Sequence, residues 1–322
     1  MSAAPAAHVS ASARAKINLA LAVSPPISEE GPRKGWHAIA SWMAPIGLAD
    51  TLAIRAAAPG EASAHEIRWA DDAPRATPID WPIEKDLAVR AHRLLEREAG
   101  RALRLRLTLE KRTPVGGGLG GGSSDAAAAL SAINRALDLG FSADRLAALS
   151  RELGSDVAFF LDGGGENGVR PALVEGFGDR IARTPRVAGD VVLILPPFGC
   201  ATPAVYKAFD SIPDETLTRQ SGQAGFNRRA EAAAALARAA MIDAGTPLFN
   251  DLAPAAELVA PGLAEIRAEA ARATETPVHV TGSGSTCFQV ARDAEHAAWL
   301  AARVRARLAE QGVNAVGSGL GV

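Results

Sequence analysis

Cysteine is scarce in this chain: two residues occur among 322, and each stands alone in the sequence. Cys200 and Cys287 are too few for the disulfide framework of a small secreted domain, and they lack the paired spacing of a metal site. We therefore expect two buried thiols that stay reduced. That expectation places the protein in the cytoplasm, where disulfides are rare.

Long apolar runs and an excess of one charge are also missing. No stretch approaches the roughly 20 consecutive apolar residues that a membrane-spanning helix needs, so no membrane partner is expected. The 34 basic and 36 acidic residues give a formal net charge of -2. No global positive field therefore favours nucleic acid as a partner, and any anion must be bound by local structure.

The composition is that of an ordinary globular protein, with 48% hydrophobic and 22% charged residues, and the length allows two domains. Strand-like patterns occupy residues 17–23, 51–55, 66–69, 103–110, 190–195, 278–281 and 287–290. Helix-like patterns occupy residues 86–99, 126–137, 142–153, 227–244, 261–273 and 294–311. Because strands and helices alternate in mixed order, the predicted fold class is α+β, with a boundary near residues 184–189.

One segment is dense in glycine: residues 114–125 read Pro-Val-Gly-Gly-Gly-Leu-Gly-Gly-Gly-Ser-Ser-Asp. It lies between a strand with strict alternation of Leu and an Ala/Leu-rich helix, for which Ser123, Ser124 and Asp125 are the expected N-cap residues. Glycine lets a backbone take positive φ and approach a ligand closely, while loop N–H groups and a helix N-terminus attract negative charge. The segment predicts a phosphate-binding loop.

Two familiar phosphate loops do not fit this segment. It contains no lysine and lacks the Gly-Lys-Ser/Thr ending of the P-loop, and no βαβ unit with a ribose-binding acid follows it. A flexible Gly/Ser linker between two domains is the plain alternative. Linkers are rarely placed so tightly between a patterned strand and a strong helix former, so a third kind of phosphate loop is favoured.

Four further clusters each allow two interpretations. Lys16 and Asn18 share one face of a strand, which is either solvated or functional. Asp156 precedes an apolar stretch and is either an N-cap or a reactive acid. Trp36-His37 is either a core aromatic with a satisfied histidine or a flat platform with a hydrogen-bonding edge. Residues 281–286, Thr-Gly-Ser-Gly-Ser-Thr, form either a simple hairpin turn or a second set of backbone donors.

In combination and order these clusters resemble the three motifs of the GHMP small-molecule kinases. The carrying segments are Ala15-Lys-Ile-Asn-Leu19, residues 114–126 and Thr281-Gly-Ser-Gly-Ser285. The resemblance extends through most of the chain. It implies a two-domain GHMP kinase fold, with an N-terminal ATP-binding domain like ribosomal protein S5 domain 2 over residues 1–185. A ferredoxin-like C-terminal α/β domain on the substrate side would cover residues 186–322.

The resemblance also implies roles. ATP would lie over the glycine-rich segment and pass its terminal phosphoryl group to a substrate hydroxyl. Asp156 would be the general base and Lys16 the cation beside it, and Asn18 would orient either the hydroxyl or Asp156. Mg²⁺ is expected with ATP, held mainly by phosphate oxygens and by Ser123 or Ser124, because no cluster forms a dedicated metal cage. The residues implied to bind ATP are Lys111, Pro114, Val115, Gly116, Gly117, Gly118, Leu119, Gly120, Gly121, Gly122, Ser123 and Ser124.

Further features point, within the family, to a small-molecule substrate that is cytidine diphosphate-linked methylerythritol. They are residues 34–37, 154–160, 175–178, 202–206 and 249–252. Trp36 and Tyr206 would sandwich the cytosine, and His37 would read its polar edge. Trp36 stands where the family usually has Tyr. Asp86 stands near the adenine pocket in place of the usual Asn, and its carboxylate cannot donate an amide hydrogen bond.

Two other functions compete with phosphorylation of a cytidylated substrate. Another GHMP kinase, acting on mevalonate, homoserine or a sugar, would have no reason to carry both the Trp36-His37 pair and Tyr206. A non-catalytic binding protein of the same fold would need neither Lys16 nor Asp156. The loops over residues 24–33 and 163–170 are longer than the family pattern suggests, and neither touches the expected chemistry.

Overall fold

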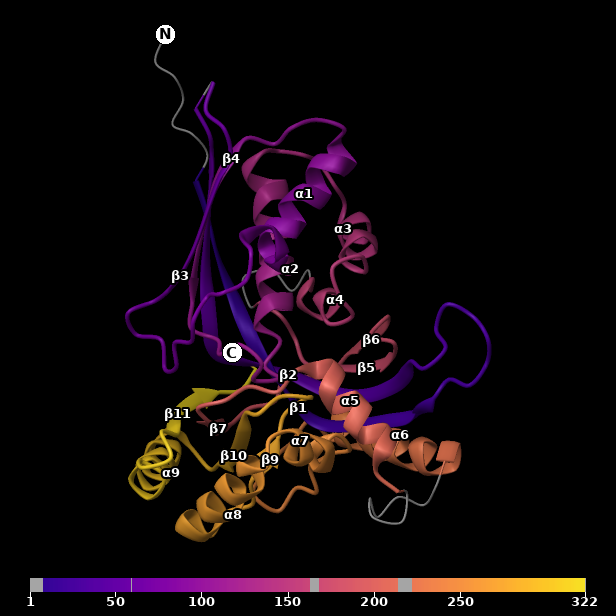
Figure 1. The fold of residues 1–322 in the computed structure, drawn as a ribbon, viewed down its shortest axis with the longest axis vertical. Coiled ribbons are helices and arrows are strands. Elements are labelled where there is room, and N and C mark those ends of the chain that lie inside the picture. Colours follow the sequence, from indigo (N-terminus) through magenta and orange to yellow (C-terminus); the bar gives the residue numbers. More distant parts are fainter. Residues whose placement is uncertain (1–7, 59, 163–167, 214–221, 322) are drawn as a thin grey trace. The chain divides into compact units, whose positions relative to one another are not determined.

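The computed structural model of this chain describes residues 8–58, 60–162, 168–213 and 222–321 (Figure 1). The chain divides into two compact units that alternate along the sequence. Unit 1 contains Met1–Ala15, Leu48–Thr113 and Gly120–Val169, and unit 2 contains Lys16–Gly47, Pro114–Leu119 and Arg170–Val322. The glycine-rich segment is therefore divided between the two units. The glycine turn expected at residues 163–165 lies outside the described residues.

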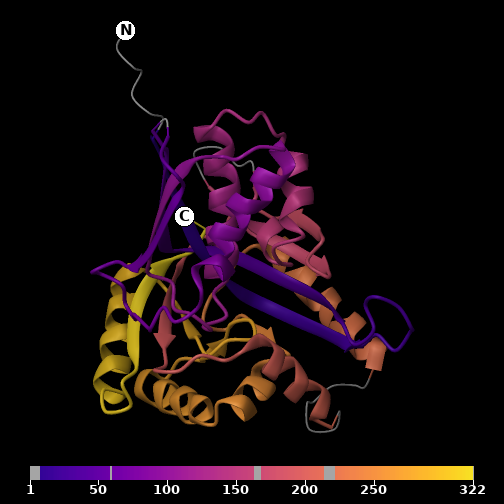
Figure 2. The same ribbon diagram turned by 45° about the horizontal axis from the view of Figure 1, so that its top comes forward.

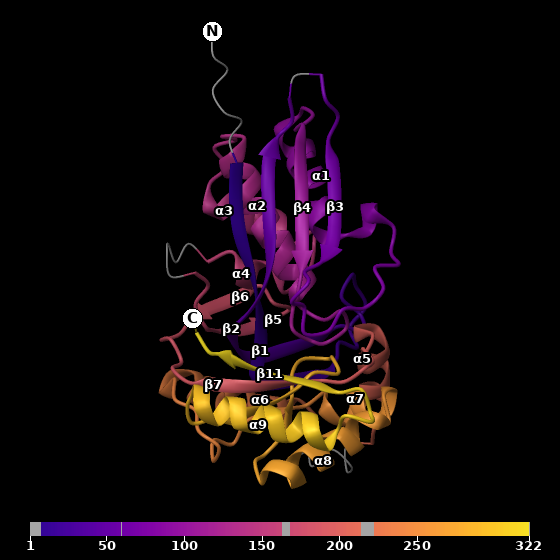
Figure 3. The same ribbon diagram turned by 90° about the vertical axis from the view of Figure 1, so that its left-hand side faces the viewer.

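Unit 1 pairs a small sheet with helices. In it the end of β2 (His37–Ala56) runs antiparallel to β4 (Leu105–Lys111), and β4 runs parallel to β3 (Ala64–Trp69). Figure 3 shows these strands side by side, together with the start of β1 (His8–Pro26), and α1 and α2 behind them. The helical elements are η1 (Ile83–Lys85), α1 (Leu87–Ala99), α2 (Gly121–Ala136), α3 (Ala143–Ser150) and α4 (Val157–Phe160).

The elements that flank the glycine-rich segment form nearly as expected. β4 buries Leu105, Leu107 and Leu109 and turns the intervening residues outward, as its alternation predicts. The expected N-cap of α2 is wrong. The helix begins at Gly121 with Gly120 as its N-cap at φ 70°, so Ser123, Ser124 and Asp125 lie inside its first turns. Glycine takes that left-handed conformation without the strain a Cβ would cause, which lets the helix start early.

Unit 2 contains a second sheet, in the order β11–β7–β10–β9. β7 (Asp190–Leu195) runs antiparallel to both β10 (Cys287–Ala291) and β11 (Asn314–Gly319), and β10 pairs with β9 (His279–Val280). The helices α8 (Gly262–Thr274) and α9 (Ala294–Arg307) pack beside each other, as Figure 2 shows in orange and yellow. Val192 and Ile194 of β7 share one apolar core with both helices.

The remaining strands of unit 2 pair with the long strands β1 and β2, either directly or through β5. β2 pairs with β5 (Ala172–Gly176), β5 pairs with β6 (Arg180–Arg183), and β1 pairs with the short β8 (Phe249–Asn250). The helices are α5 (Thr202–Ser211), α6 (Gly222–Ala239) and α7 (Ala253–Val259). Sequence patterns alone missed α5, α7, β5, β6, β8 and β11, which are short or lack a clear period.

The mixed order of strands and helices confirms the α+β class. Cys200 and Cys287 are buried free thiols, as expected, and burial raises the pKa of Cys287 to about 12. Within the described ranges, no helix is both long enough and apolar enough to cross a bilayer.

Candidate active site

The first and third motifs meet the glycine-rich segment inside unit 2. Lys16 is 3% exposed, and its Nζ donates to Asn18 Oδ1 at 2.6 Å and to the Gly118 carbonyl at 3.0 Å. The Lys16 backbone N–H donates to the Leu119 carbonyl at 2.9 Å. Lys16 and Asn18 thus share one face, as the strand pattern predicts, and that face is buried against the glycine-rich segment rather than solvated.

The two glycine turns pack backbone against backbone. The N–H groups of Ser285 and Thr286 donate to the carbonyls of Gly116 and Gly117 at 3.3 and 3.2 Å. A Cβ on Gly118 would lie 2.2 Å from the Thr281 carbonyl oxygen, and one on Gly284 would lie 2.0 Å from Gly117. Residues 281–286 are therefore more than a hairpin turn. They pack so closely against the glycine-rich segment that neither Gly118 nor Gly284 has space for a side chain.

The side-chain amide and the backbone N–H of Asn18 all have hydrogen-bond partners. Its Nδ2 donates to Ser41 Oγ at 2.8 Å, and Ser41 Oγ in turn donates to the Ala20 carbonyl at 2.8 Å. Its backbone N–H donates to Thr281 Oγ1 at 2.9 Å. Sequence analysis missed Ser41 and the role of Thr281, although a serine between apolar residues of a buried strand is a usable signal.

His37 lies in an aromatic cluster with Tyr206 and Phe209. Its ring centroid is 5.2 Å from that of Tyr206 and 5.5 Å from that of Phe209. Nδ1 lies 2.8 Å from the Ser24 carbonyl, and because a carbonyl only accepts, Nδ1 carries a proton. Nε2 lies 3.3 Å from Asp210 Oδ1. The structure thus brings the predicted His37 and Tyr206 together and adds Phe209 and Asp210.

Trp36 lies on a more open surface of unit 2. It is 53% exposed, and its ring meets the edge of Phe177 at 5.8 Å between centroids. The guanidinium of Arg33 covers the Phe177 ring at 4.4 Å, a cation–π distance. A tryptophan of the core would be buried. The exposure of Trp36 therefore favours the platform interpretation over the core interpretation.

A hollow of about 230 Å³ in unit 2 lies next to the His37 cluster. Phe209 and Asp210, which contact His37, line it together with Val23, Arg229 and Asp251. Arg229 pairs with Asp251, whose Oδ2 accepts the N–H of Val23. The lining of the hollow therefore combines apolar side chains with the Arg229–Asp251 ion pair.

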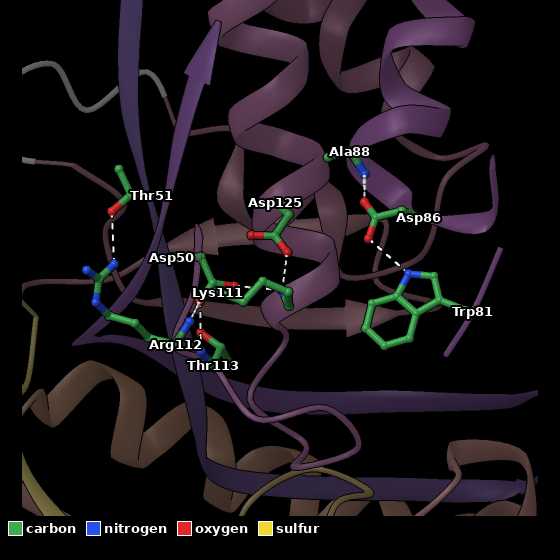
Figure 4. A network of polar contacts seen from close by, with 9 residues as sticks. All are labelled: Asp50, Thr51, Trp81, Asp86, Ala88, Lys111, Arg112, Thr113 and Asp125. Atoms are coloured by element: carbon green, nitrogen blue, oxygen red, sulfur yellow. Dashed lines mark hydrogen bonds and ion pairs between the residues drawn. The ribbon is translucent and has the colours of Figure 1, made fainter. Parts of the chain in front are cut away.

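In unit 1, Lys111 lies in a buried ionic cluster, shown in Figure 4. Its Nζ lies 2.8 Å from Asp50 Oδ2 and 2.6 Å from Asp125 Oδ2, and the lysine is 4% exposed. The two carboxylates raise the pKa of Lys111 even though burial alone would lower it. Sequence analysis missed Asp50, whose signal is a lone acid within an apolar strand segment.

Asp86 caps helix α1 and is also drawn in Figure 4. Its Oδ1 accepts the Ala88 N–H at 2.9 Å, and its Oδ2 accepts Trp81 Nε1–H at 3.3 Å. Both oxygens therefore receive donors from unit 1. A carboxylate suits this position better than an amide, since the helix N-terminus and the indole both present N–H groups.

Asp156 lies in unit 1 at the N-cap position of α4 but makes no capping hydrogen bond with its side chain. The N-cap interpretation is therefore right about position and wrong about the side chain. Ser123 and Ser124 lie in the first turn of α2, where their hydroxyl oxygens suit a hard cation. Among the described residues, no group of three or more His, Cys, Asp or Glu is arranged to hold a metal ion.

Comparison with known proteins identifies the family. Residues 86–164 match the model of the GHMP kinase N-terminal domain. A 4-diphosphocytidyl-2-C-methyl-D-erythritol kinase from Pelotomaculum thermopropionicum is 36% identical over 92% of this chain and 94% of its own. A solved 4-(cytidine 5'-diphospho)-2C-methyl-D-erythritol kinase is 30% identical, with a TM-score of 0.69 over 98% and 100% of the two chains. A homoserine kinase from Cytophaga hutchinsonii shares the fold, with a TM-score of 0.67 and 16% identity over 98% and 95%.

The fold and the match over residues 86–164 define a GHMP kinase. Within that class, the chain belongs to the 4-diphosphocytidyl-2-C-methyl-D-erythritol kinase family. The expected two-domain α+β GHMP architecture and the kinase class are thus confirmed. The domain boundary at residues 185 and 186 stays a prediction, as do the roles of the individual site residues.

Proposed function

We propose that this protein transfers the terminal phosphoryl group of ATP to the 2-hydroxyl of 4-diphosphocytidyl-2-C-methyl-D-erythritol. The products are the 2-phosphate and ADP, and the step belongs to the non-mevalonate route to isoprenoids in the cytoplasm. The observation that carries the proposal is that Lys16 Nζ, in unit 2, donates both to Asn18 Oδ1, at 2.6 Å, and to the Gly118 carbonyl of the glycine-rich segment, at 3.0 Å.

The glycine-rich segment would bind the triphosphate. Gly116, Gly118 and Gly120 have φ of 70°, 75° and 70°, and left-handed residues of this kind occur in the nests of backbone N–H groups that bind anions. α2 follows directly, and the partial positive charge of its N-terminus adds to those donors. The remaining ATP-binding candidates, from Pro114 to Ser124, belong to this segment. Backbone donors suit a phosphate because they are fixed before the ligand arrives.

Asp156 is proposed as the general base and Lys16 as the cation that stabilises developing negative charge. Phosphoryl transfer requires chiefly alignment and charge compensation, and a carboxylate can accept the hydroxyl proton late in the transfer. The Asn18 amide orients the hydroxyl. Its side-chain hydrogen bonds support that role, because Nδ2 donates to Ser41 Oγ while Oδ1 accepts from Thr281 Oγ1, and the two bonds fix the amide plane in one orientation.

Mg²⁺ would accompany ATP, held by phosphate oxygens with Ser123 or Ser124 as a protein ligand. When bound, the ion neutralises phosphate charge. The hydroxyls of the first turn of α2 fit a hard cation that retains several of its own ligands.

Cytosine recognition is assigned to Trp36, His37 and Tyr206. His37 Nδ1 is engaged by the Ser24 carbonyl, so of the two ring nitrogens Nε2, which lies 3.3 Å from Asp210 Oδ1, is the one that would meet the polar edge of a base. The half-buried Tyr206 packs against His37, and Trp36 offers an exposed aromatic face. Offset stacking of a base on an aromatic ring contributes on the order of 1 kcal/mol beyond area burial.

One assay tests this function against its rivals. ADP release is measured with 4-diphosphocytidyl-2-C-methyl-D-erythritol, mevalonate, homoserine and galactose offered separately at equal concentration. Turnover of the cytidylated substrate alone is expected. Preferred turnover of one of the other three would identify another GHMP kinase. ATP binding without ADP release from any of them would point to a non-catalytic member.

A further inference from the structure

The ionic cluster around Lys111 ties together the two ends of the glycine-rich segment. Lys111 ends β4, just before the segment, and Asp125 lies in α2, just after its last serine. The Lys111 Nζ binds Asp125 directly at 2.6 Å. A single side chain therefore connects the strand that enters the segment with the helix that leaves it (Figure 4).

Asp50 fixes the entering end more firmly. Its Oδ2 receives the Lys111 Nζ at 2.8 Å, while its Oδ1 receives the backbone N–H groups of Arg112 and Thr113, the latter at 2.7 Å. The backbone immediately before Pro114 is thus held by one fully buried carboxylate. Hydrogen bonds to a charged acceptor are stronger than those between neutral groups, so this end has little freedom.

The leaving end is fixed by steric fit as well as by charge. A Cβ on Gly121 would lie 2.7 Å from Thr113 Cγ2, so α2 starts directly against the residue that Asp50 holds. Asp125 is 1% exposed, and its Oδ1 is buried without a hydrogen-bond partner. Burial raises the pKa of Asp125 well above its ordinary value, the Lys111 ammonium opposes that rise, and the Asp50 charge adds to it.

Asp125→Asn would keep the shape of the side chain at this position. The amide oxygen of the variant could still accept from Lys111 Nζ, as Asp125 Oδ2 does at 2.6 Å.

We infer that Asp50, Lys111 and Asp125 form a positioning clamp that holds both ends of the glycine-rich segment at the spacing needed for ATP binding. This inference rests on the proposed function for the identity of the ligand. It assigns Lys111 a role through the backbone of the segment rather than through its own contact with the nucleotide. Position 125 then requires a side chain with the shape of aspartate and an oxygen atom that accepts from Lys111 Nζ.

The test compares Asp125→Ala with Asp125→Asn in the full chain. The measurements are the Kd for a non-hydrolysable ATP analogue, the KM for the cytidylated substrate, and amide hydrogen exchange of peptides spanning residues 115–124. Asp125→Ala is expected to weaken analogue binding about tenfold, the size of one lost charge-assisted hydrogen bond. It should speed exchange in the segment and leave the KM for the cytidylated substrate nearly unchanged. Asp125→Asn is expected to restore both analogue binding and slow exchange.

Leu149→Ala serves as the matched control, because it removes a buried side chain from the same unit on helix α3. It should lower the melting temperature without changing analogue affinity. The clamp is overturned if Asp125→Ala leaves both affinity and exchange unchanged, or if Asp125→Asn behaves like Asp125→Ala. Failure of the wild-type protein to bind the analogue would instead overturn the proposed function, and the exchange data would still decide whether the clamp holds the segment.

Discussion

The two parts of the glycine-rich segment are held in place by different kinds of force. Residues 114–119, in unit 2, are held by backbone packing against residues 281–286, where a Cβ on Gly118 would lie 2.2 Å from a carbonyl oxygen. Residues 120–125, in unit 1, are held by the ion pairs of Lys111. The first part therefore leaves no space for a side chain at Gly118, whereas the second part tolerates changes at Asp125 that preserve shape and hydrogen bonding.

Lys111 shows how the second part is held. It lies between the carboxylates of Asp50 and Asp125, which largely neutralise its charge. A charge already balanced by buried partners is costly to redirect toward a ligand. Lys111 is therefore suited to positioning.

The largest effect on turnover is expected from a residue outside both parts of the segment. Asp156→Asn removes the proposed base and should lower kcat by about 100- to 10,000-fold, the usual contribution of general base catalysis. Because asparagine keeps the shape of aspartate, the Kd for ATP should stay near that of the wild type. Steady-state ADP release and calorimetric titration check the two statements. Turnover close to the wild-type value would remove Asp156 from the mechanism.

Gly118→Ala breaks the first part of the segment. Its φ of 75° and the 2.2 Å approach to the Thr281 carbonyl mean that backbone must move, so stability should fall by about 4 kcal/mol or more. Gly100→Ala is the matched control, with a φ of 63° and no atom within 4 Å of the added Cβ. It isolates the conformational cost, which is about 1 kcal/mol.

Chemical denaturation measures both free energies of unfolding. Similar losses in the two glycine variants would mean that backbone packing does not distinguish the first part of the segment. A large loss confined to Gly118→Ala would sharpen the comparison, because only the close approach differs between them.

Trp36→Ala probes unit 2 away from the segment. Loss of the aromatic face should raise the KM for the cytidylated substrate about fivefold to tenfold, as expected for one stacking contact of about 1 kcal/mol. The KM for ATP should change little. Trp36→Tyr, which keeps an aromatic face, should stay near the wild type. Equal changes in the two KM values for the alanine variant would argue against stacking at this position.

The last prediction concerns the pH dependence of the free energy of unfolding, through a histidine close to residues 281–286. Burial lowers the pKa of His279 to about 4, and His279 lies on β9, two residues before Thr281. The unfolded chain binds a proton below its ordinary pKa of about 6.5, so stability is full above that pH and falls as the pH drops toward 4. From pH 7 to pH 5 the expected loss is about 1 to 2 kcal/mol.

Denaturation at both pH values, in the wild type and in His279→Gln, measures this dependence. The glutamine variant should flatten the pH dependence of unfolding, because it cannot take up the proton. An unchanged slope in His279→Gln would assign the acid sensitivity to another group.

Much of the fold could be predicted from local pattern. The alternating leucines of β4 and the apolar run of β7 appear as strands over nearly the predicted residues, since burial on one or both faces leaves a clear period. The short elements β5, β6 and β8 could not be found that way, because two to five residues carry too little periodic signal. Long-range pairing to β1 and β2 stabilises them instead.

Some residues of the candidate site could be predicted from the sequence, and others could not. The Lys16 and Asn18 pair was visible as two polar residues on one strand face. Asp50, Ser41, Phe209 and Asp210 were not visible, because each lies far in sequence from the residue that it contacts. A single sequence carries no record of which distant polar groups satisfy one another.

The sequence by itself determined the loop chemistry, since only glycine allows the positive φ and the close backbone approach at positions such as Gly118. The tertiary structure alone decided the surroundings of Lys111. Its ammonium is buried between two carboxylates, those of Asp50 and Asp125, only because folding brings both to it. Electrostatic environment depends on distances between residues remote in the chain, and those distances exist only after folding.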